Sequence, residues 1–223
     1  MALAEVGLRH GYARVRQEVV GELGRRSVLE TRAVALGLRS ALAAETDKIA
    51  ALSMVRKISD AIDDGAVAEV RALAEVGLRH NIPRVRQEVA GVLGKRGVLE
   101  ALQGDGDLHD VVVSGLRWSL SQENDMRMVR VIVAALIAAI REYGSRDAAM
   151  ALVEAGLRAR QLNVRQQVVD ALEQHLSFGE TLAQNRNVRS VIVHSLLSAG
   201  NREWDVELKN KMLRAYQRHS VSD

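Results

Sequence analysis

Hydrophobic residues recur along most of the chain at spacings of three and four, the pattern of amphipathic helices. The segment from Pro83 to Arg96 is the clearest case, because its apolar and polar positions fall on opposite helical faces. The apolar face carries Val85, Val89, Val92 and Leu93, and the polar face carries Arg84, Gln87, Glu88, Gly91 and Lys95. Pro83 suits the first turn of a helix, where its missing N–H removes no hydrogen bond. The pattern therefore predicts a helix that begins near Pro83.

The segment from Val76 to Gly94, which contains this helix start, nearly repeats the segment 70 residues earlier, from Val6 to Gly24. The tripeptide Gly-Leu-Arg recurs at intervals of 30, 40, 38 and 41 residues, starting at Gly7, Gly37, Gly77, Gly115 and Gly156. A Val-Arg pair follows each copy, at Val15, Val55, Val85, Val129 and Val164. Each unit is thus expected to hold two helices, the first bearing Gly-Leu-Arg and the second opening on Val-Arg. A glycine inside a helix costs about 1 kcal/mol relative to alanine. Its recurrence predicts close approach of neighbouring helices.

Two helices cannot bury a core alone, so the units are expected to stack. The two markers lie closer together in the odd units than in the even ones, so the longer period is a pair of units. We expect a single domain over residues 1–223, with paired units at about 1–70, 71–149 and 150–223.

Composition supports an all-α fold, since aromatic residues make up only 3% of the chain and proline occurs once. The formal net charge of +3 is too small to identify nucleic acid as the partner by itself. The chain has no cysteine, which excludes disulfides and thiolate metal sites. Its longest apolar run, from Val131 to Ile140, is about half of the roughly 20 residues needed to cross a bilayer. These features predict a cytoplasmic protein with no membrane segment.

The helix pairs opening on "VRQEVAGVLG" and "VRQQVVDAL" resemble HEAT repeats, particularly the HEAT-like type of phycobilin-lyase-related proteins. The resemblance covers essentially the whole chain as six units. It implies an α-solenoid, a right-handed superhelix of about six HEAT-like helix pairs, and says little about function.

Arginines lie at or near the predicted starts of the second helices, where an anion-binding edge for phosphates or acidic segments is one interpretation. Its residues would be Arg14, Arg16, Arg84, Arg86, Arg127, Arg130 and Arg165. The other interpretation is structural: Arg14–Glu18 and Arg84–Glu88 form i,i+4 pairs, while Arg16 and its equivalents bridge adjacent units.

The second helices of units two and four are apolar at positions that are polar elsewhere. Such a helix is either buried or meets a partner. The partner-binding interpretation assigns contacts to Met54, Ile58, Met128, Val131, Ile132, Ala135 and the nearby Trp118. A homodimer through this stripe is a further alternative. In the structural interpretation the same residues belong to the core.

No stretch identifies a reaction, so no catalytic residue, metal ligand or cofactor is expected. The six histidines are scattered, and the acidic segment from Gln103 to Asp110 fits a linker with a helix N-cap better than a calcium loop. We therefore predict a non-enzymatic HEAT-like repeat scaffold that binds a protein or peptide partner on its concave surface. Nucleic-acid binding through the arginines is the alternative. A HEAT-like DNA glycosylase, or an accessory lyase or chaperone for a chromoprotein, is supported only by family analogy.

Overall fold

The structure, a computed structural model, describes residues 6–25, 32–62, 67–103, 105–175 and 185–220. Every regular element in these ranges is a helix, which confirms the all-α prediction. None of the described helices is both long enough and apolar enough to cross a membrane. The chain divides into two compact units, Met1–Gly115 and Leu116–Asp223, and the division falls within helix α8.

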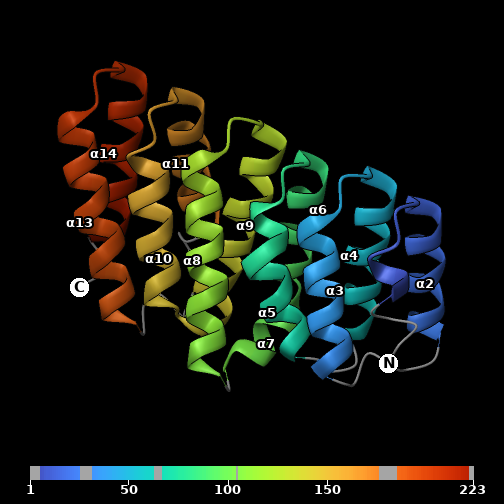
Figure 1. The fold of residues 1–223 in the computed structure, drawn as a ribbon. Coiled ribbons are helices and arrows are strands. Elements are labelled where there is room, and N and C mark those ends of the chain that lie inside the picture. The colour runs from blue at the N-terminus through green and yellow to red at the C-terminus, as the bar shows by residue number, and fades with distance from the viewer. Residues whose placement is uncertain (1–5, 26–31, 63–66, 104, 176–184, 221–223) are drawn as a thin grey trace. The chain divides into compact units, whose positions relative to one another are not determined.

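The first unit is built from helices that contact one another in alternation (Figure 1). Helix α4 packs against both α2 and α6, while α3 packs against α5, so that consecutive helices fall into two layers. The elements are α2 (Ala13–Arg25), α3 (Arg32–Ala44), α4 (Lys48–Ile62), α5 (Val67–Val76), η2 (Gly77–Arg79), α6 (Pro83–Leu93), α7 (Arg96–Gln103) and the start of α8 (Gly106–Gln122).

The second unit has the same alternation within itself. Helix α11 packs against α9 and α14, and α13 packs against α10 and η3. The elements after α8 are α9 (Met126–Tyr143), α10 (Arg146–Ala151), η3 (Leu152–Leu157), α11 (Leu162–His175), α13 (Arg186–Arg202) and α14 (Val206–Ser220).

Helix starts follow local chemistry that the sequence displays. Pro83 occupies the first turn of α6, as predicted. Asp105 accepts a hydrogen bond from the amide of Leu108 over 2.9 Å, which confirms that the acidic segment before α8 provides an N-cap. Gly144 ends α9 with a φ of 60°, a left-handed conformation that favours glycine.

The recurring tripeptide glycines allow close helix packing, as predicted, except Gly37, where an added methyl group would meet only Leu8 Cδ1 at 3.6 Å, an ordinary contact. A methyl group placed on Gly7, Gly77 or Gly156 would lie 2.5, 2.6 or 2.5 Å from a Cγ2 atom of Val19, Val89 or Val168, respectively. Each valine belongs to the helix that follows its glycine. The same contact thus recurs three times, twice in the first unit and once in the second.

The Val-Arg marker does not open a helix in every unit. Val55 lies in the middle of α4, which begins seven residues earlier at Lys48. The expectation that the second helix of unit two opens at Val55 is therefore wrong.

The apolar stripe predicted to face a partner is largely core. Met54 and Ile58 on α4, and Met128, Ile132 and Ala135 on α9, are all at most 3% exposed. Their assignment as partner contacts is wrong for a physical reason. Helix α4 packs against α2, α3, α5 and α6, and α9 packs against α10 and α11, so apolar residues cover most of their circumference. A homodimer through this stripe would need the same residues at the surface. Val131 is partly exposed, and Trp118 is 40% exposed.

Candidate functional site

The buried acid Glu45, in the turn between α3 and α4, is bound by Arg16 of α2. Arg16 Nε and Nη2 donate to its two carboxylate oxygens over 2.5 and 2.6 Å, and the amide of Asp47 donates to Oε1 over 2.8 Å. Arg16 Nη1 also donates to the carbonyl oxygens of His10 and Gly11. The Glu45 side chain is 0% exposed and that of Arg16 is 15% exposed. One guanidinium therefore joins the turn before α2 to the turn before α4.

The ionised state of this pair is favoured on both sides. Burial by itself raises the pKa of Glu45, but the hydrogen bonds from Arg16 and from the amide of Asp47 outweigh it and hold the pKa below its ordinary value of 4.5. The hydrogen bond to Glu45 likewise raises the pKa of Arg16. The pair is ionised at neutral pH, and its guanidinium is already occupied.

The second unit repeats this arrangement with Arg165 and Glu203. Arg165 Nε and Nη2 donate to the carboxylate over 2.7 and 3.0 Å, and Nη1 donates to the carbonyl oxygens of Ala159 and Arg160, both over 2.9 Å. The hydrogen bond from Arg165 lowers the pKa of Glu203 below its ordinary value. The structural interpretation, in which such arginines bridge neighbouring helix pairs, thus holds for Arg16 in the first unit and for Arg165 in the second.

The acidic partners of these arginines were missed by the sequence analysis. They stand in Glu-x-Asp triplets, at Glu45-Thr46-Asp47 and Glu203-Trp204-Asp205, and in both the glutamate accepts the amide of the aspartate. The aspartate then caps the next helix, accepting from the amides of Ala50 and Leu208 over 2.8 Å. Glu123-Asn124-Asp125 has the same glutamate-to-amide bond. The spacing of about 80 residues between successive triplets is the signal that could have found them.

The remaining arginines of the predicted anion-binding edge differ in their hydrogen-bond partners and exposure. Arg86 donates to the carbonyl oxygens of His80 and Asn81. Arg84 donates to Gln87 over 2.8 Å and Arg130 to Gln167 over 3.2 Å. Arg14 and Arg127 are exposed. Within the described residues neither Arg14–Glu18 nor Arg84–Glu88 forms an ion pair, so both predicted i,i+4 pairs are wrong.

His80 is a buried histidine of the first unit, 5% exposed. Its Nδ1 accepts the amide of Ile82 over 3.1 Å, and His10, which is exposed, makes the same bond with the amide of Tyr12 over 3.2 Å. Burial lowers the pKa of His80, and the backbone carbonyls of Leu42 and Glu45 offset this only in part. The ring is therefore neutral at neutral pH.

We expect His80 to make the chain less stable in mild acid. A histidine with a lowered folded-state pKa keeps its neutral form while the unfolded chain takes up a proton below about pH 6.5, so the free energy of unfolding falls as the pH drops below that value. One such group contributes at most about 1.4 kcal/mol per pH unit. Urea unfolding of the wild type and of His80→Asn at pH 7 and pH 5 measures the effect, because asparagine keeps an acceptor for the Ile82 amide and cannot titrate. His10→Asn is the matched control, and equal acid sensitivity of wild type and His80→Asn would contradict the prediction.

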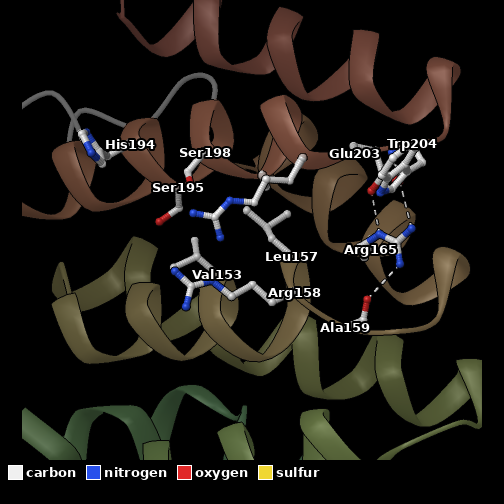
Figure 2. A pocket seen from close by; sticks show the side chains of 12 residues that line it. Val153, Leu157, Arg158, Ala159, Arg165, His194, Ser195, Ser198, Glu203 and Trp204 are labelled. Carbon is white, nitrogen blue, oxygen red and sulfur yellow. Dashed lines mark hydrogen bonds and ion pairs between the residues drawn. The ribbon is translucent and has the colours of Figure 1, made fainter.

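A cavity of about 450 Å³ lies in the second unit, between η3 and α13 (Figure 2). Ser195 and Ser198 line it from α13, while Val153 and Leu157 line it from η3. Its remaining lining residues are Arg158, Ala159, Arg165, His194, Ala199, Arg202, Glu203 and Trp204. Figure 2 shows the Arg165–Glu203 pair together with Trp204 at one end.

The lining of this cavity is positively charged. Arg165 and Glu203 neutralise each other, and Glu203 is the sole carboxylate in the lining. Arg158 and Arg202 are exposed, and neither has an ion-pair partner in the described part of the chain. Two positive charges therefore remain uncompensated. The cavity can accept an anionic group, and the sequence analysis named only Arg165 among its residues.

Three large aromatic side chains are exposed among the described residues, and one of them, Tyr12, is 76% exposed in the first unit. Trp204, in the turn between α13 and α14, is 94% exposed, whereas Trp118 on α8 is 40% exposed. The amide of Trp204 donates to Glu203 Oε1 over 3.1 Å. The Arg165–Glu203 ion pair therefore also holds the backbone that carries this indole. Trp204 is the aromatic side chain of the cavity.

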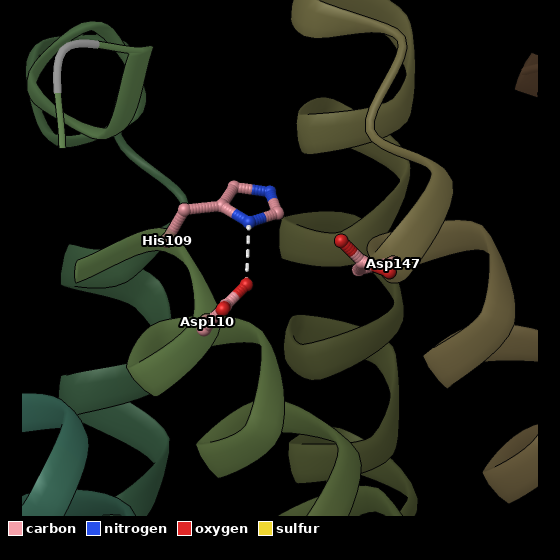
Figure 3. Close-up of side chains that lie close together, drawn as sticks. All are labelled: His109, Asp110 and Asp147. Carbon is pink, nitrogen blue, oxygen red and sulfur yellow. Dashed lines mark ion pairs between the residues drawn. The ribbon is translucent and has the colours of Figure 1, made fainter. Parts of the chain in front are cut away.

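The beginning of α8 holds one further pair of titratable residues in the first unit. His109 Nδ1 lies 3.6 Å from Asp110 Oδ1 (Figure 3). The Asp110 side chain is 73% exposed, and the two residues are adjacent on one helix. Two ligand side chains from this unit are fewer than a protein zinc site uses.

No protein-family model matches the chain, and no curated protein proved similar to it.

Proposed function

We propose that this chain is a HEAT-like α-solenoid scaffold that binds a protein partner, and that it does so through the cavity between η3 and α13. The proposal of stacked helix pairs is supported by the alternating helix contacts within each unit and by the three equivalent glycine–valine contacts. The bound element of the partner is a short acidic segment. No reaction is part of the proposal.

The uncompensated charge of Arg158 and Arg202 is the observation that carries this function. Charge-assisted bonds from guanidinium to carboxylate are stronger than neutral hydrogen bonds. Arginine and tryptophan are also the residues on which binding energy concentrates at protein interfaces, and Trp204 lines the same cavity as the two arginines. Val153 and Leu157 supply apolar surface in the same cavity.

An acidic peptide tests the proposal directly. The probe is a fluorescein-labelled peptide in which glutamates flank one leucine, and its control has glutamine for glutamate. We expect the acidic peptide to bind more tightly, with an affinity that falls as salt rises. Arg202→Gln and Arg158→Gln should each raise Kd about tenfold, the loss expected for one charge-assisted contact.

Arg160→Gln is the matched control. Arg160 is an exposed arginine in the same turn as Arg158, between η3 and α11, but it does not line the cavity. The proposal fails if the acidic peptide does not bind at low salt, or if Arg160→Gln weakens binding as much as Arg202→Gln does.

Nucleic acid is the alternative ligand. It has less support, because the guanidiniums of Arg16 and Arg165 bind glutamates of the fold and that of Arg86 binds backbone carbonyls. A labelled DNA duplex in the same titration separates the two ligands. Binding of the duplex that is weakened equally by Arg84→Gln and Arg202→Gln would favour a dispersed nucleic-acid surface over the cavity.

A further inference from the structure

The cavity of the second unit contains more unoccupied hydrogen-bond donors than a single carboxylate would need. The guanidiniums of Arg158 and Arg202, the hydroxyls of Ser195 and Ser198, and the imidazole of His194 all line it. None of these five side chains has a hydrogen-bond or ion-pair partner within the described part of the chain. These donors are therefore available to the oxygen atoms of a ligand.

We propose that this cavity binds a phosphate monoester, the phosphorylated serine or threonine of the partner segment. The inference rests on the proposed function and specifies its ligand. A carboxylate brings one negative charge and two oxygens, whereas a phosphorylated side chain brings a charge of about −1.5 to −2 and three strong acceptor oxygens. Two uncompensated guanidiniums match the charge of the phosphate.

The two serine hydroxyls of the lining add hydrogen-bond donors to the positive charge of the two arginines. Ser195 and Ser198 are three residues apart on α13, so they lie on neighbouring positions of one helical face. Figure 2 shows both side chains on the α13 side of the cavity. A tetrahedral group can accept from hydroxyls on one wall while its other oxygens meet guanidiniums.

The Arg165–Glu203 pair keeps the carboxylate of Glu203 from repelling a phosphate. Glu203 accepts two bonds from Arg165 and two from the amides of Trp204 and Asp205, and its side chain is 5% exposed. Its charge is compensated and turned away from solvent. The net charge that a ligand meets in the cavity is thus set by Arg158 and Arg202.

Trp204 indicates what flanks the phosphate. Its indole is 94% exposed while its backbone is held by Glu203. An exposed indole on a fixed backbone offers a large contact surface for an apolar side chain of the bound segment. The fitting partner is a phosphorylated serine or threonine next to an apolar residue.

Three peptides of one sequence test this inference, with serine, phosphoserine or glutamate at the position beside a leucine. The full chain carrying Trp118→Phe is used, because the chain has two tryptophans and Trp204 then becomes the single indole reporter. We expect the phosphopeptide to bind at least about tenfold more tightly than the glutamate peptide. Inorganic phosphate should compete with it.

Two variants and one control distinguish recognition of the phosphate group from binding of acidic peptides in general. Ser195→Ala combined with Ser198→Ala should reduce the preference for phosphoserine over glutamate while binding of the glutamate peptide stays nearly constant. Arg202→Gln should weaken both peptides, and Arg160→Gln should weaken neither. Unchanged circular dichroism and urea midpoints show that each variant is folded.

The outcomes distinguish this inference from the function on which it rests. If the glutamate peptide binds at the cavity and the phosphopeptide is no tighter, the phosphate inference is overturned and acidic-segment binding stands. If neither peptide binds, both fall. A phosphopeptide that binds Arg158→Gln and Arg202→Gln as tightly as wild type also overturns the phosphate site.

Discussion

Glu45→Gln is expected to destabilise the first unit by roughly 3 kcal/mol, the range found when one partner of a buried ion pair is removed. The glutamine side chain is of nearly the same size but has one acceptor oxygen. Glu45 accepts from Arg16 Nε, from Arg16 Nη2 and from the amide of Asp47, so an amide group in its place sets a donor against a donor. The 15% exposure of Arg16 leaves little water to replace the lost acceptor. Urea unfolding followed by circular dichroism measures the loss as a lower midpoint.

The exposed pair Arg96–Glu100 supplies the matched control in the same unit. Its side chains are 84% and 55% exposed, and its atoms approach to 2.8 Å. Glu100→Gln is expected to change the free energy of unfolding by at most about 0.5 kcal/mol, because solvent screens such pairs. If Glu45→Gln and Glu100→Gln change the free energy of unfolding equally, burial of the Arg16–Glu45 pair has no energetic consequence.

The direction of the pH effect follows from the lowered pKa of Glu45. A carboxyl group with a lowered folded-state pKa contributes stability that is fully present above its unfolded value, here 4.5, and is lost as the pH falls through the folded value. The difference between wild type and Glu45→Gln should therefore shrink below pH 4.5. This window lies below that of His80, so the two groups can be separated by pH.

Gly77→Ala is the second substitution with a large expected effect, a loss of about 1–3 kcal/mol from overpacking. The added methyl group would lie 2.6 Å from Val89 Cγ2 and 3.1 Å from Cγ1. Valine is stiff about its first side-chain torsion, so neither methyl group can turn away at low cost. The two helices must instead separate, which loosens their buried contact. The same unfolding measurement applies.

Two comparisons identify the cause of this loss. Gly21, inside α2, has no atom within 4 Å of an added Cβ, so Gly21→Ala should stabilise the chain by up to about 1 kcal/mol through helix propensity alone. In a Val89→Ala background the obstructing methyl groups are absent, and Gly77→Ala should then be neutral or stabilising. A loss in that background as large as in the wild type would rule out the contact with Val89 as the cause.

The ion pairs Arg16–Glu45 and Arg165–Glu203 show how far local sequence reasoning extends. The pattern identified Arg16 and Arg165 as equivalent and offered bridging as one of their two roles. It did not identify Glu45 or Glu203, because these lie 29 and 38 residues away, across an intervening helix. Spacing within one helix predicts neighbours three or four residues apart. It carries no information about which distant turn packs against that helix.

The apolar helices α4 and α9 are a second case in which the sequence pattern left two interpretations open. Hydrophobic periodicity indicated that α4 and α9 are apolar on most faces, and this is why Met54 and Ile132 are buried. A buried helix and a helix that binds a partner have the same apolar sequence, because both exclude water from the same residues. Only the packing of α4 between α2 and α6, and of α9 against α10 and α11, decides for the core.

The sequence by itself determined the all-α class, the helix start at Pro83, the N-cap before α8 and the close approach at the recurring glycines, since each depends on interactions between neighbours in sequence or on the volume of one residue. The tertiary structure decided which charges are free. Arg165 and Arg202 are chemically identical in the sequence, and the fold binds the first to Glu203 while it leaves the second exposed at the cavity. The physical reason is that a charge is neutralised by whatever the folded chain brings within a few ångströms of it, and that distance depends on the packing of whole helices.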